Sequence, residues 1–149
     1  MFEEKIANGW IHSRIMLEVE GNDKEHVHKA LQEVCEKLKS EKGISVFKET
    51  FDSVKELRPG WFNLNVELEL LVKGVDRFVY LVTSYPPVSL EILAPQDIAC
   101  PASELQSALL GIAGYVNTLS NALHLHVRKV QKAEAEQEKL RQEFQKLKR

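Results

Sequence analysis

The C-terminal third of the chain, residues 102–149, reads ASELQSALLGIAGYVNTLSNALHLHVRKVQKAEAEQEKLRQEFQKLKR. Apolar residues recur there at spacings that alternate between four and three from beginning to end, with His126 and Gln137 as polar exceptions. This heptad spacing predicts one α-helix with an apolar stripe along one side. The stripe consists of Leu105, Leu109, Ile112, Val116, Leu119, Leu123, His126, Val130, Ala133, Gln137, Leu140, Phe144 and Leu147.

A helix of this length is too long to be covered by the rest of the chain. At ~1.5 Å per residue it extends roughly 70 Å, whereas about 100 residues form a domain only ~30 Å across. We therefore expect its distal half to need a partner, and we predict that the stripe is an oligomer interface. Ser120-Asn121 is the place where a break would give a helical hairpin, but the uninterrupted spacing favours a continuous helix.

Composition and charge suit a globular domain with an extension. The chain has 149 residues, of which 44% are hydrophobic, enough for a packed core and too many for a disordered protein. Residues 128–149 contain eight Lys/Arg and four Glu, a charge of +4, while residues 1–127 contain twelve Lys/Arg and eighteen Asp/Glu, a charge of −6. The basic tail is either the solvated surface of a coiled coil or docks on the acidic body of another copy.

Cysteine usage and hydropathy indicate a cytoplasmic protein. Cys35 and Cys100 have neither CxxC nor zinc-site spacing. We find neither an apolar run of the signal-peptide type nor one of ~18 residues, so we expect no membrane association.

Residues 1–9 are predicted to form an arm, residues 10–98 one α+β domain, and residues 99–149 the long helix. Alternation of apolar and polar residues predicts strands at residues 10–20, 44–51, 61–72 and 88–93. Helical spacing after Asn22 or Asp23, either of which suits an N-cap, predicts a helix that Gly43 terminates.

Two further segments are assigned from weaker patterns. Residues 74–85 have the composition of a strand but the apolar spacing of a helix, and we assign them to a short helix that Asp76 caps. Residues 52–60 are polar, and we interpret them as a connection that closes on a Pro59-Gly60 turn.

The resulting order, β-α-β-β-α-β followed by a long helix, resembles the ferredoxin-like arrangement over residues 10–95. The resemblance rests on element order alone. It implies a two-layer sandwich in which a four-stranded antiparallel sheet carries both helices on one face. The other face would then carry His12, Arg14, Met16, Glu18, Asn63, Asn65, Glu67, Glu69 and Glu91.

Several side chains have the chemistry of metal ligands. Glu67 and Glu69 project the same way and would suit a divalent cation, but we prefer to interpret them as part of an exposed strand face kept soluble by charge. The pairs His26/His28 and His124/His126 lie on predicted helices, where residues two apart diverge, which disfavours metal binding. We therefore expect no metal site and no cofactor.

For two other residues, His126 and Cys100, the sequence leaves two interpretations open. His126 lies on the stripe, where copies that meet would bury imidazoles side by side and make assembly pH-sensitive, unless it lies at a hydrated edge. Cys100 precedes the long helix, whose dipole would activate the thiol, but it has no neighbouring histidine to act as a base and is otherwise an inert loop thiol.

The sequence favours a binding or assembly role over catalysis. We recognise no phosphate loop, catalytic triad or HExxH pattern. The acidic body and the Asn and Glu residues of the strand at 61–72 disfavour nucleic-acid binding. We expect a homo-oligomeric scaffold that assembles through its C-terminal helix and can hold a protein partner. The alternative is a regulatory sensor of the ferredoxin-like (ACT-like) type that binds a small ligand or metal.

Overall fold

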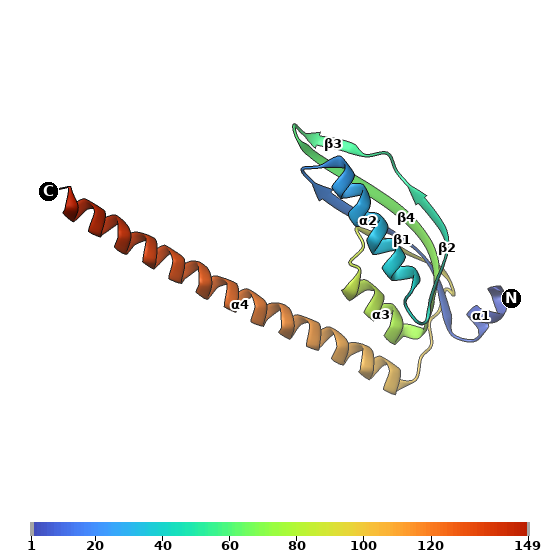
Figure 1. Ribbon diagram of the computed structural model, residues 1–149. Coiled ribbons are helices and arrows are strands. Elements are labelled where there is room, and N and C mark those ends of the chain that lie inside the picture. Colours follow the sequence, from blue (N-terminus) through green and yellow to red (C-terminus); the bar gives the residue numbers. More distant parts are fainter. Residues whose placement is uncertain (1, 149) are drawn as a thin grey trace. The chain divides into compact units, whose positions relative to one another are not determined.

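The protein is a mixed α+β molecule in the computed structural model, which describes residues 2–148 (Figure 1). Its two compact units are Met1–Gly111 and Ile112–Arg149. The elements are α1 (Phe2–Ala7), β1 (Trp10–Gly21), α2 (Lys24–Lys39), β2 (Ile44–Phe51), β3 (Lys55–Arg58), β4 (Trp61–Lys73), α3 (Gly74–Ser84), β5 (Ser89–Ala94) and α4 (Ala102–Leu147).

The strands form one antiparallel sheet in the order β2-β4-β1-β5, and β3 pairs with β4. The central pair runs from Trp10 opposite Lys73 to Gly21 opposite Phe62. Both strands alternate apolar and polar residues over most of their length, so most of their apolar side chains reach one face. That face packs against α2 and α3 and forms the core, which includes Ile15, Leu31, Leu68, Leu70 and Leu81.

The strands predicted at residues 10–20, 44–51 and 61–72 correspond to β1, β2 and β4. The antiparallel sheet and the long C-terminal helix are confirmed as well. The expected number of four strands was wrong, because residues 52–60 contain β3. All four residues of β3 are exposed, so no apolar alternation marks it, and backbone pairing with the start of β4 holds it in place.

Helix α2 begins at the second of its two candidate caps. The Asp23 side chain accepts a hydrogen bond from the backbone N–H of His26 at 2.8 Å. The buried side of the helix comprises Val27, Leu31, Cys35 and Leu38. Burial raises the pKa of the Cys35 thiol to about 11, so this cysteine is a core residue without thiolate character at neutral pH.

Helix α3 confirms the helical assignment of residues 74–85, which had rested on apolar spacing. Helix α4 continues through Ser120 and Asn121, so the helical hairpin does not form. Among residues 2–148, none of the helices has the length and apolar character that would let it cross a bilayer.

Candidate functional site

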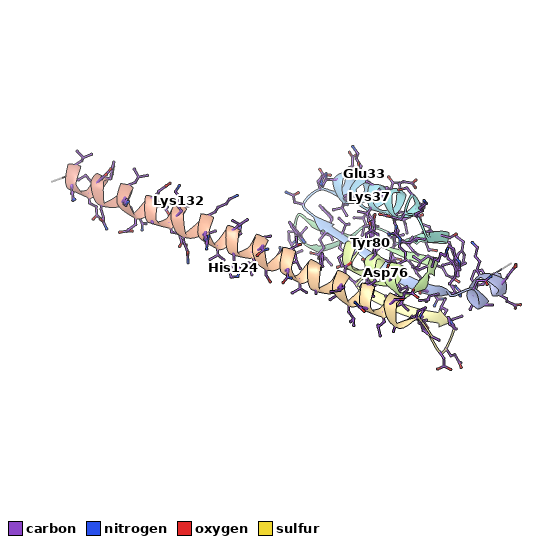
Figure 2. The ribbon with its side chains drawn as sticks, turned by 90° about the horizontal axis from the view of Figure 1, so that it is seen from below. Glu33, Lys37, Asp76, Tyr80, His124 and Lys132 are labelled. Carbon is purple, nitrogen blue, oxygen red and sulfur yellow. The ribbon has the colours of Figure 1, made fainter. Side chains whose placement is uncertain are left out.

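The apolar stripe of α4 lies open along the helix. Its large apolar side chains, from Leu105 to Leu147, are between 40% and 85% exposed. In the unit Ile112–Arg149, residues 112–147 belong to α4 and Lys148 follows the helix, so the described part of this unit offers the stripe no second element to pack on. Figure 2 shows the α4 side chains, His124 and Lys132 among them, projecting from the helix into solvent.

The first turns of α4 contact the sheet-containing unit through a different side of the helix. The Glu104 carboxylate accepts a hydrogen bond from the backbone N–H of Val75 at 2.7 Å. Ser107 donates a hydrogen bond to Asp76 at 3.3 Å, and Ala108 is buried. Each residue turns the helix by ~100°, so these contacts leave the stripe residue Leu105 facing outward, and it is 47% exposed.

Glu104 supplies the N-terminal cap of α3 that the sequence had assigned to Asp76. That assignment was wrong because the Asp76 carboxylate accepts from Ser107, while its backbone N–H lies 3.5 Å from Glu104 Oε1. Gly74 makes room for the Glu104 carboxylate, since a Cβ at this position would lie 2.3 Å from the same oxygen. The α3 N-terminus attracts negative charge, which the carboxylate of α4 provides.

A groove of about 920 Å³ lies beside this cap. It is formed by the end of α1 and the start of β1, the first turn of α3, and the segment that leads into α4. Its lining includes Trp10, Asp76, Arg77, Cys100 and Glu104. Of the two interpretations of Cys100, the activated thiol gains no support, because the residues that line the groove include no histidine to act as a base.

The sheet face that α2 and α3 leave uncovered is polar, but three of its carboxylates, those of Glu67, Glu69 and Glu91, lie beside basic groups. Glu69 lies 2.9 Å from His12, and Arg14 lies 3.0 Å from Glu91 and 3.8 Å from Glu67. The two carboxylates considered for a cation therefore each have a basic neighbour. Residues 2–148 contain no group of three or more His, Cys, Asp or Glu arranged to hold a metal ion.

An aromatic cluster on the same face was missed at the sequence level. The ring of Phe2, from α1, meets His12 edge-on at 4.7 Å and Phe47 edge-on at 5.4 Å. The cluster lies near Leu71, which pairs with His12 and is buried although it belongs to the polar face. In the sequence of this arm, the one pattern that would indicate α1 is the four-residue spacing of Phe2 and Ile6.

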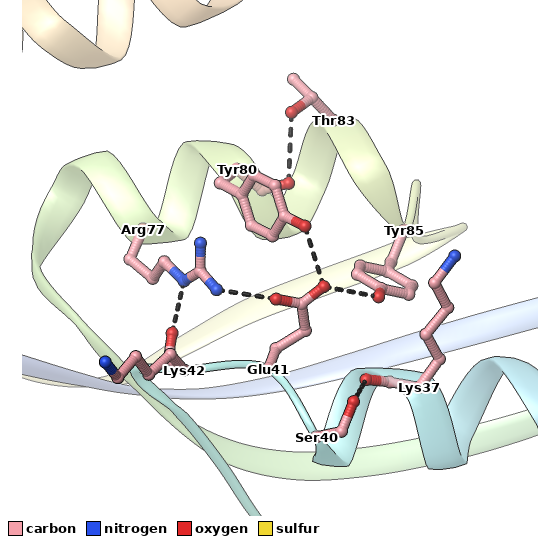
Figure 3. A network of polar contacts seen from close by, with 8 residues as sticks. All are labelled: Lys37, Ser40, Glu41, Lys42, Arg77, Tyr80, Thr83 and Tyr85. Carbon is pink, nitrogen blue, oxygen red and sulfur yellow. Dashed lines mark hydrogen bonds and ion pairs between the residues drawn. The ribbon is translucent and has the colours of Figure 1, made fainter.

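A second cluster missed from the sequence centres on Glu41, in the loop after α2 (Figure 3). Its carboxylate accepts hydrogen bonds from Tyr80 at 2.8 Å, Tyr85 at 2.9 Å and Arg77 at 2.7 Å. The two tyrosine hydroxyls, together with Arg77, hold the pKa of Glu41 below its ordinary value. Burial and the Glu41 carboxylate raise the pKa of Tyr85 to about 12. The cluster connects α3 to the loop after α2 through these hydrogen bonds.

Comparison with known proteins places the chain in a family. Searches found no match among curated proteins and none among solved structures. The model of the MJ0538 family matches residues 12–146, which run from β1 to the last turn of α4 and so include parts of both compact units. A match over most of the chain shows membership, and the protein therefore belongs to the MJ0538 family.

Proposed function

We propose that the protein is a self-associating interaction module whose copies meet through the apolar stripe of α4. The exposure of this stripe, with large apolar side chains at least 40% exposed from Leu105 to Leu147, is the observation that supports the proposal. Soluble monomers rarely expose contiguous apolar patches larger than a few hundred Å². Burial of each such side chain contributes on the order of 1.5–3 kcal/mol before association costs.

The contacts of α4 with the sheet-containing unit are compatible with such an assembly. Glu104, Ser107 and Ala108 make these contacts, and none of them belongs to the stripe. Two copies can therefore meet along the stripe while each keeps the cap of its own α3. The sheet domain would then act as the part that each copy presents to a protein partner.

For the sheet domain itself we propose a ferredoxin-like arrangement to which β3 is an addition. With β3 set aside, the elements from β1 to β5 follow the order βαββαβ, and α2 and α3 pack on one face. An experimental structure with a different pairing of β2 or β5 would contradict this proposal.

Substitution of a stripe residue tests the proposed interface directly. Leu123, on the stripe, and Leu125, off it, are 62% and 59% exposed and lie two residues apart on α4. We expect Leu123→Asp to lower the mass measured by sedimentation velocity toward that of one chain, because it places a charge in the contact. The matched variant Leu125→Asp should keep the mass of the unmodified protein.

Truncation after Asn121 should also lower the mass, because it removes the distal half of the stripe. Two results would contradict self-association through α4: a single-chain mass for the unmodified protein at micromolar concentration, or an unchanged mass for both Leu123→Asp and the truncated protein.

The groove beside the α3 cap supports a second candidate function, the binding of a small ligand. Its volume of about 920 Å³ and its mixture of apolar and charged lining residues suit a metabolite. Thermal-shift measurements with amino acids, nucleotides and divalent cations would test this, because a ligand that binds the folded state raises the melting temperature. The absence of any shift would leave self-association as the single candidate.

A further inference from the structure

We infer that two copies pair through α4 as a parallel, in-register, two-stranded coiled coil. This inference rests on the proposed self-association and adds its orientation, register and number of chains. The charges that flank the stripe, together with its polar residue Gln137, carry the argument.

The stripe residues fall into the two apolar positions of a heptad, a and d. Position a is occupied by Leu109, Val116, Leu123, Val130, Gln137 and Phe144, and position d by Leu105, Ile112, Leu119, His126, Ala133, Leu140 and Leu147. Leucine predominates at d and valine occurs twice at a, a distribution that favours two strands over three or four. All of these positions belong to α4.

Charged residues flank the last three heptads at the positions g and e. Position g carries Lys129, Glu136 and Glu143, and position e carries Glu134, Arg141 and Lys148. All six residues are exposed, so they are available to a second helix. In coiled coils, the charges at e and g set the choice and orientation of the partner.

In a parallel, in-register pair, each g residue faces the e residue five positions later on the other helix. The facing pairs are then Lys129 with Glu134, Glu136 with Arg141, and Glu143 with Lys148. Each pair has opposite charges, and the twofold symmetry forms each of them twice. The arrangement thus contains six attractive contacts and no repulsive one at these positions.

Antiparallel pairing lacks this complementarity. An antiparallel overlap of the whole stripe sets the charged distal flanks against the proximal flanks, which consist of Gln106, Ala108, Ala113, Tyr115, Ser120 and Ala122. The acidic and basic residues would then face uncharged side chains. A shorter antiparallel overlap leaves Leu105 and Leu109 uncovered, although both are exposed on the helix.

The polar residue Gln137 selects the register. In register, Gln137 faces Gln137 of the second copy, and two amides can donate to and accept from each other. A shift by one heptad sets it against Val130 or Phe144, which leaves a buried amide without a partner at a cost of ~1–3 kcal/mol. A polar residue at one a position is a known means of fixing register.

Charge exchange between two variants tests the orientation. Lys129→Glu and Glu134→Lys each turn two attractive contacts of the homodimer into repulsive ones, and we expect each to weaken it roughly tenfold. In a mixture, the parallel heterodimer has opposite charges at both contacts. Native mass spectrometry should therefore find more heterodimer than the statistical half.

The control for the charge exchange is a variant whose charge lies away from the proposed contact. Lys132→Glu, at an outward position of the same helix, should neither weaken the dimer nor mix selectively with Glu134→Lys. Statistical mixing of Lys129→Glu with Glu134→Lys would overturn the parallel orientation, because an antiparallel pair does not bring these two residues together.

Disulfide formation tests the register independently. In a background with Cys35→Ala and Cys100→Ser, we expect Leu119→Cys and Leu140→Cys each to form covalent dimers under mild oxidation. Equivalent d residues meet in a parallel, in-register pair, whereas an antiparallel pair brings at most one of these two positions opposite itself.

The outcomes separate the two proposals. A single-chain mass for the unmodified protein overturns self-association as well as this inference. A dimer that cross-links at one position alone overturns the orientation and leaves self-association standing. A three-chain or four-chain mass overturns the two-stranded form.

Discussion

At Glu41, a single carboxylate holds together three side chains of the α3 region. Because hydrogen bonds from Tyr80 and Tyr85 and the charge of Arg77 lower its pKa, the folded protein favours the ionised form more than the unfolded chain does. The resulting stabilisation is present above the unfolded value of 4.5 and is lost as the pH falls through the lowered folded value.

We therefore predict that Glu41→Gln changes the acid sensitivity of the protein. Melting temperatures between pH 2 and 7 should show the variant to be less stable than the unmodified protein near neutrality, and the difference should shrink below about pH 4.5. Glu33→Gln, at an exposed position of α2, is the control and should leave the pH dependence unchanged. A difference that stays constant over the whole range would contradict the role of Glu41.

At Gly74, two separate effects disfavour a side chain. Its φ of +80° lies in the left-handed region, and a Cβ would collide with the Glu104 carboxylate. We predict that Gly74→Ala lowers the free energy of unfolding by about 2–3 kcal/mol, from backbone strain and loss of the cap together. Gly60→Ala, with a φ of +73° and open space around it, should show the strain alone and lose about 1 kcal/mol.

Urea unfolding measures both glycine variants. Adding Glu104→Ala to Gly74→Ala should cost less than the sum of the two single changes, because the collision disappears. Additive losses would mean that the Glu104 carboxylate does not occupy the space beside Gly74.

At the scale of the element, strands differ in how firmly the sheet holds them. β5 is short, pairs with β1 alone, and has Leu90 and Ile92 about 40% exposed, whereas β1 and β4 are paired on both sides. We predict that amide hydrogens of β5 exchange at least tenfold faster than those of the β4 centre. Hydrogen exchange followed by mass spectrometry would show this, and equal protection of the two strands would contradict it.

The sequence predicts an element when one of its sides is buried. β1 and β4 show this, since their alternation follows from a buried face opposite a polar one. β3 gave no such pattern because its residues are all exposed. The Glu41 cluster could not be foreseen either, since its partners lie at least 36 residues away in sequence and meet only after folding. The stripe and its flanking charges are local patterns and could be predicted.

At the scale of the whole molecule, the core and most of the stripe belong to different parts of the chain. Among residues 2–148, all buried apolar residues precede Ile112, whereas the stripe continues to Leu147. We predict that a chain ending at Gly111 folds, sediments as a single copy, and melts at a temperature independent of its concentration. The full chain should melt at a temperature that rises with concentration, because association stabilises it. Calorimetry at two concentrations measures the contrast, and a concentration-independent full chain would contradict assembly.

Glu104, which caps α3, is the immediate neighbour of Leu105, the first stripe residue. In a two-stranded coiled coil, each helix is slightly underwound. Because Glu104 and Leu105 are neighbours on α4, such a change would rotate both residues about the axis of α4. A rotation of the first turns of α4 would therefore reach the first turn of α3 through the contacts that Glu104 and Ser107 make. The pairing of two copies that we propose would thus be coupled to the position of α3 within each copy.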